Sequence, residues 1–203
     1  MRYSFFSGIL AGIMVGIGGA VYMSCESKVA GAVLFAVALL TICYMGMYLY
    51  TGKIGFLAEK FSLDTVKQLA LGIVGNFIGA TAFGYLVGFA RPSLVEKAAT
   101  ACSAKLENGF FQALVLGACC GILMYVAVKT YRENKTVVGI LFCIPVFILC
   151  GFEHSIANMF YFALANMPSG KYIVFILAVI LGNTVGAMII PWVNKLAVGK
   201  AEK

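Results

Sequence analysis

The sequence predicts an all-α integral membrane protein with six transmembrane helices. Of its 203 residues, 62% are hydrophobic and 11% are charged, whereas a soluble domain is about 25% charged. A helix crosses a bilayer with about 20 apolar residues, and six runs reach that length. The polar joints between them are short, so we expect one transmembrane domain over 1–203. The runs lie near residues 4–24, 30–58, 66–90, 109–128, 137–164 and 172–194.

The first run is too long for a cleavable signal peptide and has no small-residue cleavage site, so we expect it to remain as the first span. The seven cysteines are scattered and form no C-x-x-C pair. They are typical of small buried hydrophobic residues, and a disulfide framework or a zinc site is not expected. We therefore expect no metal and no cofactor.

The formal net charge of +7 is compatible with nucleic-acid binding, but membrane topology explains it better. Six spans place both termini and the joints at 53–67 and 129–136 on one side. Because the more basic side faces the cytoplasm, both termini are expected there, in a multi-pass protein of the inner (cell) membrane. That side carries Arg2, Lys53, Lys60, Lys67, Lys129, Arg132, Lys135, Lys195, Lys200 and Lys203, and the other carries Lys28, Arg91, Lys97, Lys105 and Lys171.

The chain contains an internal repeat. GNFIGA at 75–80 recurs as GNTVGA at 182–187, which is an offset of 107 residues. The same offset maps the first span onto the fourth, so the chain reads as two copies of a three-span unit, about 1–100 and 108–200. An odd number of spans inverts the second copy, and inverted repeats in transporters place the pathway at their interface.

The second and fifth spans are each interrupted. The first interruption is GMYLYTG at 46–52, and adding 107 gives EHSIANM at 153–159. Irregular backbone at membrane depth is tolerated only where it is buried in protein or lines a cavity. The matched breaks in helices 2 and 5 therefore indicate a pathway.

Glycines at four-residue spacing are expected to let other helices approach closely. They are Gly8, Gly12 and Gly16 in the first span and Gly117 and Gly121 in the fourth.

Glu153 and His154 are the ionisable residues that lie well inside a span, where a charge costs a few kcal/mol on insertion scales. A histidine satisfied by a backbone carbonyl is the structural alternative to a pathway residue. For Asn76, Asn158 and Asn183, helix-to-helix hydrogen bonding is the commoner role.

Thr51 lies in the first break. Its hydroxyl either bonds back to a helix carbonyl or faces the pathway near His154.

GFEHSIANM at 151–159, LYTG at 49–52 and the paired GN-x-x-G segments resemble the formate/nitrite transporter family, span for span over nearly the whole chain. The resemblance implies an aquaporin-like fold and a homopentamer with one pore per protomer. It also implies transport of small monovalent anions such as formate, nitrite or hydrosulfide, with no redox cofactor.

The resemblance also assigns residues. Its central histidine matches His154, and its lysine that draws anions into the outer vestibule matches Lys105. The substrate pathway so implied comprises His154, Thr51, Glu153, Asn158, Asn183 and Lys105, with an outer constriction at Phe35 and Phe147 and an inner one at Leu39 and Tyr50.

Two departures from the family pattern stand out. Many members read acid-Leu-Phe-Thr where this chain has Tyr48-Leu49-Tyr50-Thr51, so an acidic group is missing from the first break. Gly121 stands where many members have an asparagine in the fourth span.

The expected mechanism follows from the free energy needed to place an ion in an apolar constriction. A bare ion in a low-dielectric medium costs tens of kcal/mol. Protonating an acid of pKa about 3.7 at neutral pH costs roughly 4 kcal/mol. We therefore expect the substrate to cross as its neutral acid, with Thr51 and His154 donating hydrogen bonds and a proton shared at that site.

Three other classes are weighed against this one. A neutral-solute channel of the aquaporin type shares the architecture, but the chain has no Asn-Pro-Ala pair. A membrane redox subunit with bis-histidine haem is excluded by the single histidine, and the sequence does not predict an enzyme. A purely structural scaffold leaves the matched breaks unexplained.

Overall fold

The computed structural model describes residues 1–201, with side chains for 1–197, and the described residues form helices joined by turns and loops, without strands. Lys200 and Lys203, which entered the charge argument, lie outside the residues whose side chains are described. The helices are α1 (Arg2–Ser24), α2 (Lys28–Tyr44), α3 (Tyr50–Lys53), α4 (Phe56–Glu59), α5 (Leu63–Ala90), α6 (Ser93–Leu106), α7 (Phe110–Asn134), α8 (Val138–Leu149), α9 (Ser155–Leu164) and α10 (Gly170–Ala201).

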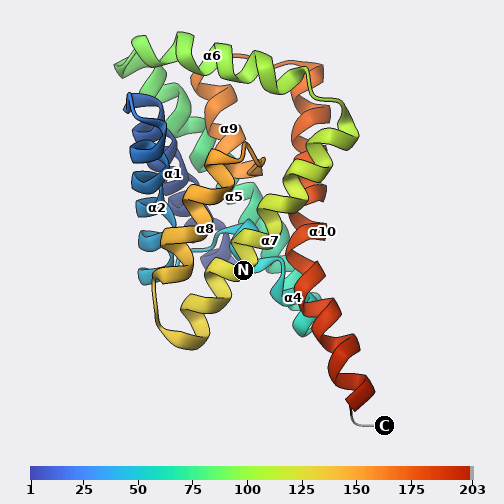
Figure 1. Ribbon diagram of the computed structural model, residues 1–203. Helices are drawn as coiled ribbons and strands as arrows, with labels where there is room; N and C mark the ends of the chain where they lie inside the picture. Colours follow the sequence, from blue (N-terminus) through green and yellow to red (C-terminus); the bar gives the residue numbers. More distant parts are fainter. Residues whose placement is uncertain (202–203) are drawn as a thin grey trace.

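Within the described residues, α1, α5, α7 and α10 are long and apolar enough to cross a membrane. The second pass combines α2 with the short α3, and α4 follows outside that pass, while the fifth pass combines α8 with α9. Figure 1 shows α6 running across the top of the molecule and α4 in its lower half, with the long helices between. The predicted fold class, an all-α membrane protein with its second and fifth helices broken, is confirmed.

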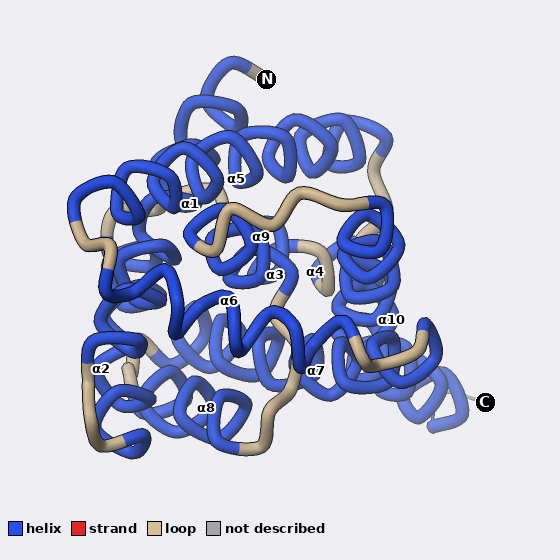
Figure 2. The backbone as a smooth tube through the Cα atoms, turned by 90° about the horizontal axis from the view of Figure 1, so that it is seen from above, coloured by secondary structure: helices blue, strands red, loops and turns tan. Residues whose placement is uncertain are grey.

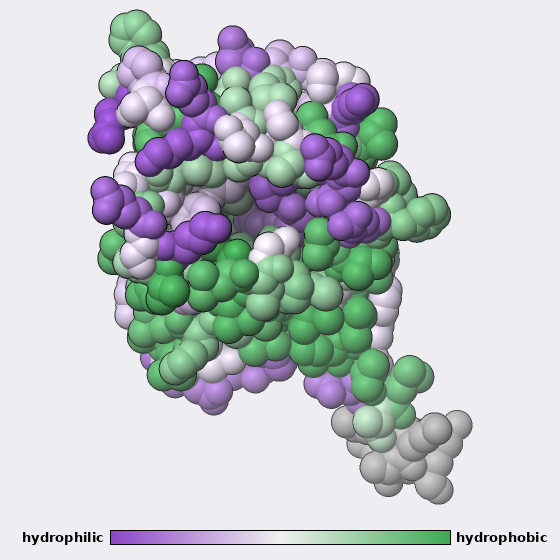
Figure 3. Space-filling view, turned by 45° about the horizontal axis from the view of Figure 1, so that its top comes forward, coloured by the Kyte–Doolittle hydropathy of each residue, from purple (hydrophilic) through white to green (hydrophobic). Residues whose placement is uncertain are grey.

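The surface is that of a protein embedded in lipid. Figure 3 shows a band of hydrophobic residues below a hydrophilic upper face. Large apolar side chains such as Phe89 and Phe111 are 87% and 79% exposed, respectively. Exposed apolar patches of this extent are stable only against lipid or another protein.

The glycine stripes bring α1 onto α5 and α7 onto α10, as expected. A Cβ atom added to Gly12 would lie 2.3 Å from the carbonyl oxygen of Asn76. One added to Gly121 would lie 2.3 Å from the carbonyl oxygen of Asn183. Both distances are far below contact distance, so these helices pack backbone to backbone.

The two breaks lie at residues 45–49 and 150–154. Each contains a glycine in the left-handed region, Gly46 with φ +66° and Gly151 with φ +68°. Figure 2 shows α9, α3 and α4 inside the ring of longer helices, so both breaks open toward the centre.

The expected pairing of 46–52 with 153–159 is wrong by two residues. The break glycines are 105 positions apart, whereas the GN segments are 107 apart. Connecting segments of unequal length in the two halves shift the offset, so Tyr48 corresponds to Glu153 and Leu49 to His154. The later part of the expected first break is helical, because Thr51 lies in the first turn of α3.

Residues 93–106, expected to be a polar joint, form the helix α6. Leu94, Ala98 and Cys102 are buried at four-residue spacing along it, which is the apolar stripe of a surface helix. The search for membrane-length runs missed it because its other face is polar. In Figure 2 it crosses above the centre of the molecule.

Candidate functional site

Two asparagines hold the ends of the breaks. Asn76 on α5 accepts the N–H of Tyr50 at 2.9 Å and donates to the carbonyl oxygens of Tyr48 at 2.9 Å and Gly8 at 2.8 Å. A helix that starts within the membrane leaves backbone donors and acceptors free, and lipid cannot satisfy them. Asn76 therefore closes the first break onto α1.

Asn183 on α10 makes the same three bonds in the second half. It accepts the N–H of Ser155 at 2.9 Å and donates to the carbonyl oxygens of Glu153 and Gly117, both at 2.8 Å. Asn183 is fully buried, and both of its N–H donors are bound to backbone. The residue expected on the substrate pathway thus lies behind the break and positions it.

Thr51 and His154 meet at the centre of the molecule. The Thr51 Oγ1 and His154 Nε2 atoms are 2.8 Å apart, and His154 Nδ1 accepts the N–H of Ala157 at 3.1 Å, which caps α9. Because Nδ1 is an acceptor, a neutral imidazole carries its proton on Nε2 and donates it to Thr51. The hydroxyl hydrogen of Thr51 is then available to a ligand.

This geometry decides between the two roles that the sequence left open for His154 and for Thr51. His154 contacts a helix N-terminus and a threonine hydroxyl instead of a backbone carbonyl. Thr51 contacts the imidazole instead of a helix carbonyl.

The neighbouring acid is buried and paired. Glu153 is 3% exposed, and its Oε2 accepts from Lys105 Nζ at 2.5 Å and from Asn158 Nδ2 at 2.9 Å. A buried carboxylate is tolerated only with such partners. Lys105 reaches it from α6, so the helix that the sequence did not predict brings the cation to the site.

A cavity of about 180 Å³ opens above the imidazole, and we call it the upper cavity. Phe147 stacks on the ring of His154, with centroids 5.8 Å apart, and the edge of Phe35 meets Phe147 at 6.2 Å. The two phenyl rings, expected to form the outer constriction, thus lie together beside the imidazole. Residues lining the upper cavity include Phe35, Lys105, Phe147, Glu153, His154 and Asn158, all of them predicted for the site.

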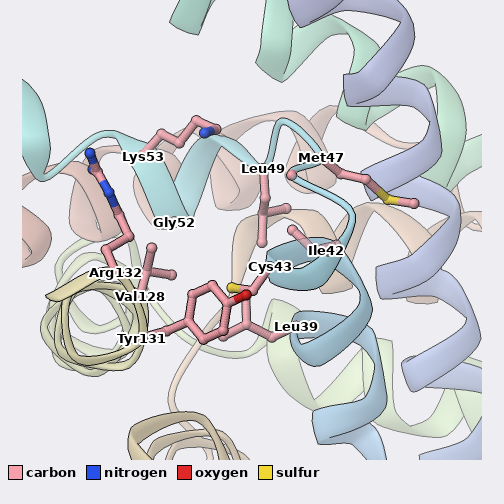
Figure 4. A pocket seen from close by; sticks show the side chains of 11 residues that line it. Leu39, Ile42, Cys43, Met47, Leu49, Gly52, Lys53, Val128, Tyr131 and Arg132 are labelled. Carbon is pink, nitrogen blue, oxygen red and sulfur yellow. The ribbon is translucent and has the colours of Figure 1, made fainter. Parts of the chain in front are cut away.

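A second cavity of about 180 Å³, the lower cavity, lies beside α3 (Figure 4). It is lined by Leu39, as expected for the inner constriction, and by Leu49, Lys53, Arg132 and Cys43, which sequence reasoning did not single out. Gly52 also lines it, so the bond between Thr51 and His154 lies between the two cavities.

Tyr50 does not line the lower cavity. Its hydroxyl lies 2.7 Å from Thr184 Oγ1 on α10, because successive residues at the start of α3 point in different directions. Leu49, the residue before Tyr50, lines that cavity together with Leu39. The corrected repeat register, which pairs Leu49 with His154, is the sequence signal that identifies it.

Polar groups below the lower cavity tie α4 to α7. Glu59 Oε1 accepts from Tyr125 at 2.5 Å and from Lys129 at 2.9 Å. Partial burial alone would raise the pKa of Glu59, but the hydrogen bonds from Tyr125 and Lys129 and the charge of Lys129 hold it below its ordinary value. Glu59 therefore stays ionised at neutral pH.

Known proteins similar to this chain belong to one family of membrane transporters. The formate/nitrite transporter family model matches residues 1–196. The transporter YrhG of Bacillus subtilis, described as uncharacterised, is 32% identical over 182 residues, which are 80% of this chain and 68% of YrhG. The formate channel FocA of Haemophilus influenzae is 27% identical over 183 residues, which are 77% of this chain and 64% of FocA.

Solved structures share the fold. A pentameric formate channel with formate bound superposes with a TM-score of 0.81 at 24% identity, covering all of this chain and 98% of that one. An ion channel of the same family superposes with a TM-score of 0.78 at 23% identity, covering 97% and 88% of the two chains. Because the family model spans almost the whole chain and its named relatives are channels and transporters, this protein is not an enzyme and belongs to the formate/nitrite transporter family.

Proposed function

We propose that this protein is a channel for small monovalent anions of the formate or nitrite class, which cross as their neutral acids at Thr51 and His154. The observation that carries the proposal is the 2.8 Å contact between these two side chains. It lies between Phe35 and Phe147 on one side and Leu39 and Leu49 on the other.

The energetics favour the neutral acid at this point. Four apolar side chains offer an anion no compensation for its lost hydration, and a bare ion in such a medium costs tens of kcal/mol. Protonation at neutral pH costs roughly 4 kcal/mol for an acid of pKa about 3.7. The free hydroxyl hydrogen of Thr51 then binds an oxygen of the substrate.

The hydrogen bonds of His154 bear on where the proton that neutralises the substrate comes from. Its Nδ1 is occupied by the N–H of Ala157, so protonation there would remove the cap of α9. Loss of the proton from Nε2 would leave an anionic ring in an apolar site. Both arguments favour a proton taken from water, with the neutral imidazole orienting Thr51.

We further infer the assembly and orientation. The broad exposed apolar surface and the pentameric state of a structural relative support a homopentamer with one pathway per protomer. The excess of basic residues on the α4 side supports a cell-membrane protein with that side in the cytoplasm. The two halves, about 1–100 and 108–200, act as inverted copies around the pathway, in a single transmembrane channel domain.

Flux in proteoliposomes tests the proposal. Purified protein is assayed with formate, nitrite and hydrosulfide across pH, with glycerol and urea as neutral solutes. We expect anion flux that rises as pH falls, and a loss of at least tenfold in His154→Asn. Swelling in glycerol without anion flux would contradict the proposal, and unchanged flux and pH dependence in His154→Asn would remove the histidine from the mechanism. Hydrosulfide flux exceeding formate flux would favour the sulfide alternative.

A further inference from the structure

The lower cavity carries two cations without a carboxylate. Lys53 lines it from α3 and Arg132 from α7, and among the residues whose side chains are described no aspartate or glutamate lines it. Figure 4 shows the two cations on one side of the cavity and Leu39, Cys43 and Ile42 on the other. The cavity therefore has one charged wall and one apolar wall.

Neither cation forms a salt bridge with a described acidic side chain, although Arg132 is near enough to Glu59 for its charge to help to hold the pKa of that carboxyl down. Among the described side chains, the three salt bridges join Lys105 to Glu153 and Lys129 to Glu59 and Glu133.

Aromatic rings support the two cations instead. Lys53 Nζ lies 5.0 Å from the ring centroid of Tyr48, and the Arg132 guanidinium lies 4.0 Å from that of Phe56. A ring face holds a cation in place while leaving its full charge.

The repeat identifies the position at which the first half of the chain has no acidic residue. Tyr48 and Glu153 occupy equivalent positions, because an asparagine amide binds the backbone carbonyl of each. In the upper cavity, the carboxylate of Glu153 pairs with Lys105. In the lower cavity, the equivalent position holds the phenol ring of Tyr48, so neither Lys53 nor Arg132 has a carboxylate to pair with at that position.

We propose that the lower cavity is a second anion-binding site, at which Lys53 and Arg132 hold a small monovalent oxyanion below the constriction of Leu39 and Leu49. The guanidinium presents parallel N–H donors that match the two oxygens of a carboxylate or nitrite, and the ammonium adds a point charge. The volume of about 180 Å³ admits such an anion with several waters, since each water takes about 30 Å³. The inference rests on the proposed function and deepens it.

The site has a kinetic consequence for the transported anion. An anion arriving from the α4 side is concentrated beside the constriction before it loses its hydration. Flux from that side therefore saturates at a lower concentration than it would without the two charges, and it weakens as salt screens them.

Formate flux with variants of the two cations is the first test. We expect Lys53→Gln with Arg132→Gln to raise the half-saturating formate concentration on the α4 side about tenfold and to reduce the salt dependence of flux. Lys53→Arg retains the charge and should stay within twofold of the unmodified protein. The control is Lys60→Gln, an exposed lysine near α4 that does not line the cavity. Equal half-saturation in the double variant and in this control would overturn the proposal.

A binding measurement separates this proposal from the transport function. Cys43 lines the same cavity, and its modification by thiosulfonate reagents can be followed by mass spectrometry of its peptide. The ratio of the rates with negatively and positively charged reagents cancels changes in thiol reactivity.

We expect the negative reagent to be preferred, formate to slow its reaction, and the double variant to lose at least fivefold of the preference. If formate does not protect Cys43, the site is refuted even if flux is normal. If formate protects Cys43 while flux is absent, the proposed function fails and the site remains.

Discussion

His154 at the start of α9 contacts Thr51 in the first turn of α3, with Nε2 and Oγ1 2.8 Å apart across 103 residues of sequence. Each side chain belongs to a different broken pass. The contact therefore exists only because both breaks reach the centre of the molecule.

Thr51→Val should reduce formate flux in proteoliposomes at least tenfold. The isosteric methyl group keeps the volume but removes both the hydroxyl that accepts from His154 and the hydrogen that it offers to the substrate. Thr51→Ser keeps both and should stay within threefold. Normal flux in Thr51→Val, with an unchanged elution volume in size-exclusion chromatography, would show that the hydroxyl takes no part.

Asn183→Ala should destabilise the protein as much as Asn76→Ala. Each substitution removes three hydrogen bonds to buried backbone groups, and each buried group left unpaired costs about 1–3 kcal/mol. Thermal unfolding in detergent measures the loss. A melting temperature within 1–2 °C of the unmodified protein (~0.5 kcal/mol) would contradict the positioning role that we assign to both residues.

Gly121→Ala should prevent α7 from reaching α10. The added methyl would lie 2.3 Å from a backbone oxygen of Asn183, so one helix must shift. Gly109→Ala is the matched control at the start of the same helix, because nothing lies within 4 Å of its Cβ position. We expect a lower melting temperature only for Gly121→Ala, and equal melting temperatures would contradict the close packing.

Lys105→Gln should impair flux at low formate concentration. It removes a cation from the upper cavity and leaves the carboxylate of Glu153, 3% exposed, with Asn158 as its remaining side-chain partner. Removing one member of a buried pair typically costs 3–5 kcal/mol. Adding Glu153→Gln should restore the melting temperature but not the low-concentration flux. Restored flux would show that Lys105 serves only to neutralise Glu153.

Lowering the pH should reduce the local stability of α4. The folded pKa of Glu59 lies below its ordinary value of 4.5, so its bonds to Tyr125 and Lys129 stabilise the fold fully above that pH. The contribution is lost as pH falls through the lowered pKa. Hydrogen-exchange protection of α4 should therefore drop only at a pH below that ordinary value, while that of α5 stays constant. Glu59→Gln should remove this pH dependence, and if the drop persists in that variant, another group is responsible.

Much of the candidate site could be predicted from its residue types. An acid, a histidine and an asparagine within six positions of an apolar run are costly in lipid, so their presence alone indicated a protein-lined pathway. Six of the expected residues line the upper cavity, and Thr51 meets His154, which is one of the two alternatives that its place in the first break left open.

The directions in which side chains point could not be predicted from the sequence in the same way. Tyr50 and Leu49 are adjacent and both apolar enough for a constriction, yet only Leu49 lines the lower cavity. Asn183 carries the polar groups of a pathway residue, but the backbone of the break takes up both of its N–H donors. These outcomes depend on where each short helix starts.

The sequence by itself determined the membrane character, the six passes, the two breaks and the family, because composition, run length, the recurring GN segments and the GFEHSIANM motif are properties of the chain alone. Only the tertiary structure decided the register of the repeat, the helix that carries Lys105 to Glu153, and the placing of Lys53 and Arg132 at the lower cavity. Those features depend on segments that are distant in sequence. They arise because buried backbone groups and charges must find partners that the local chain does not supply.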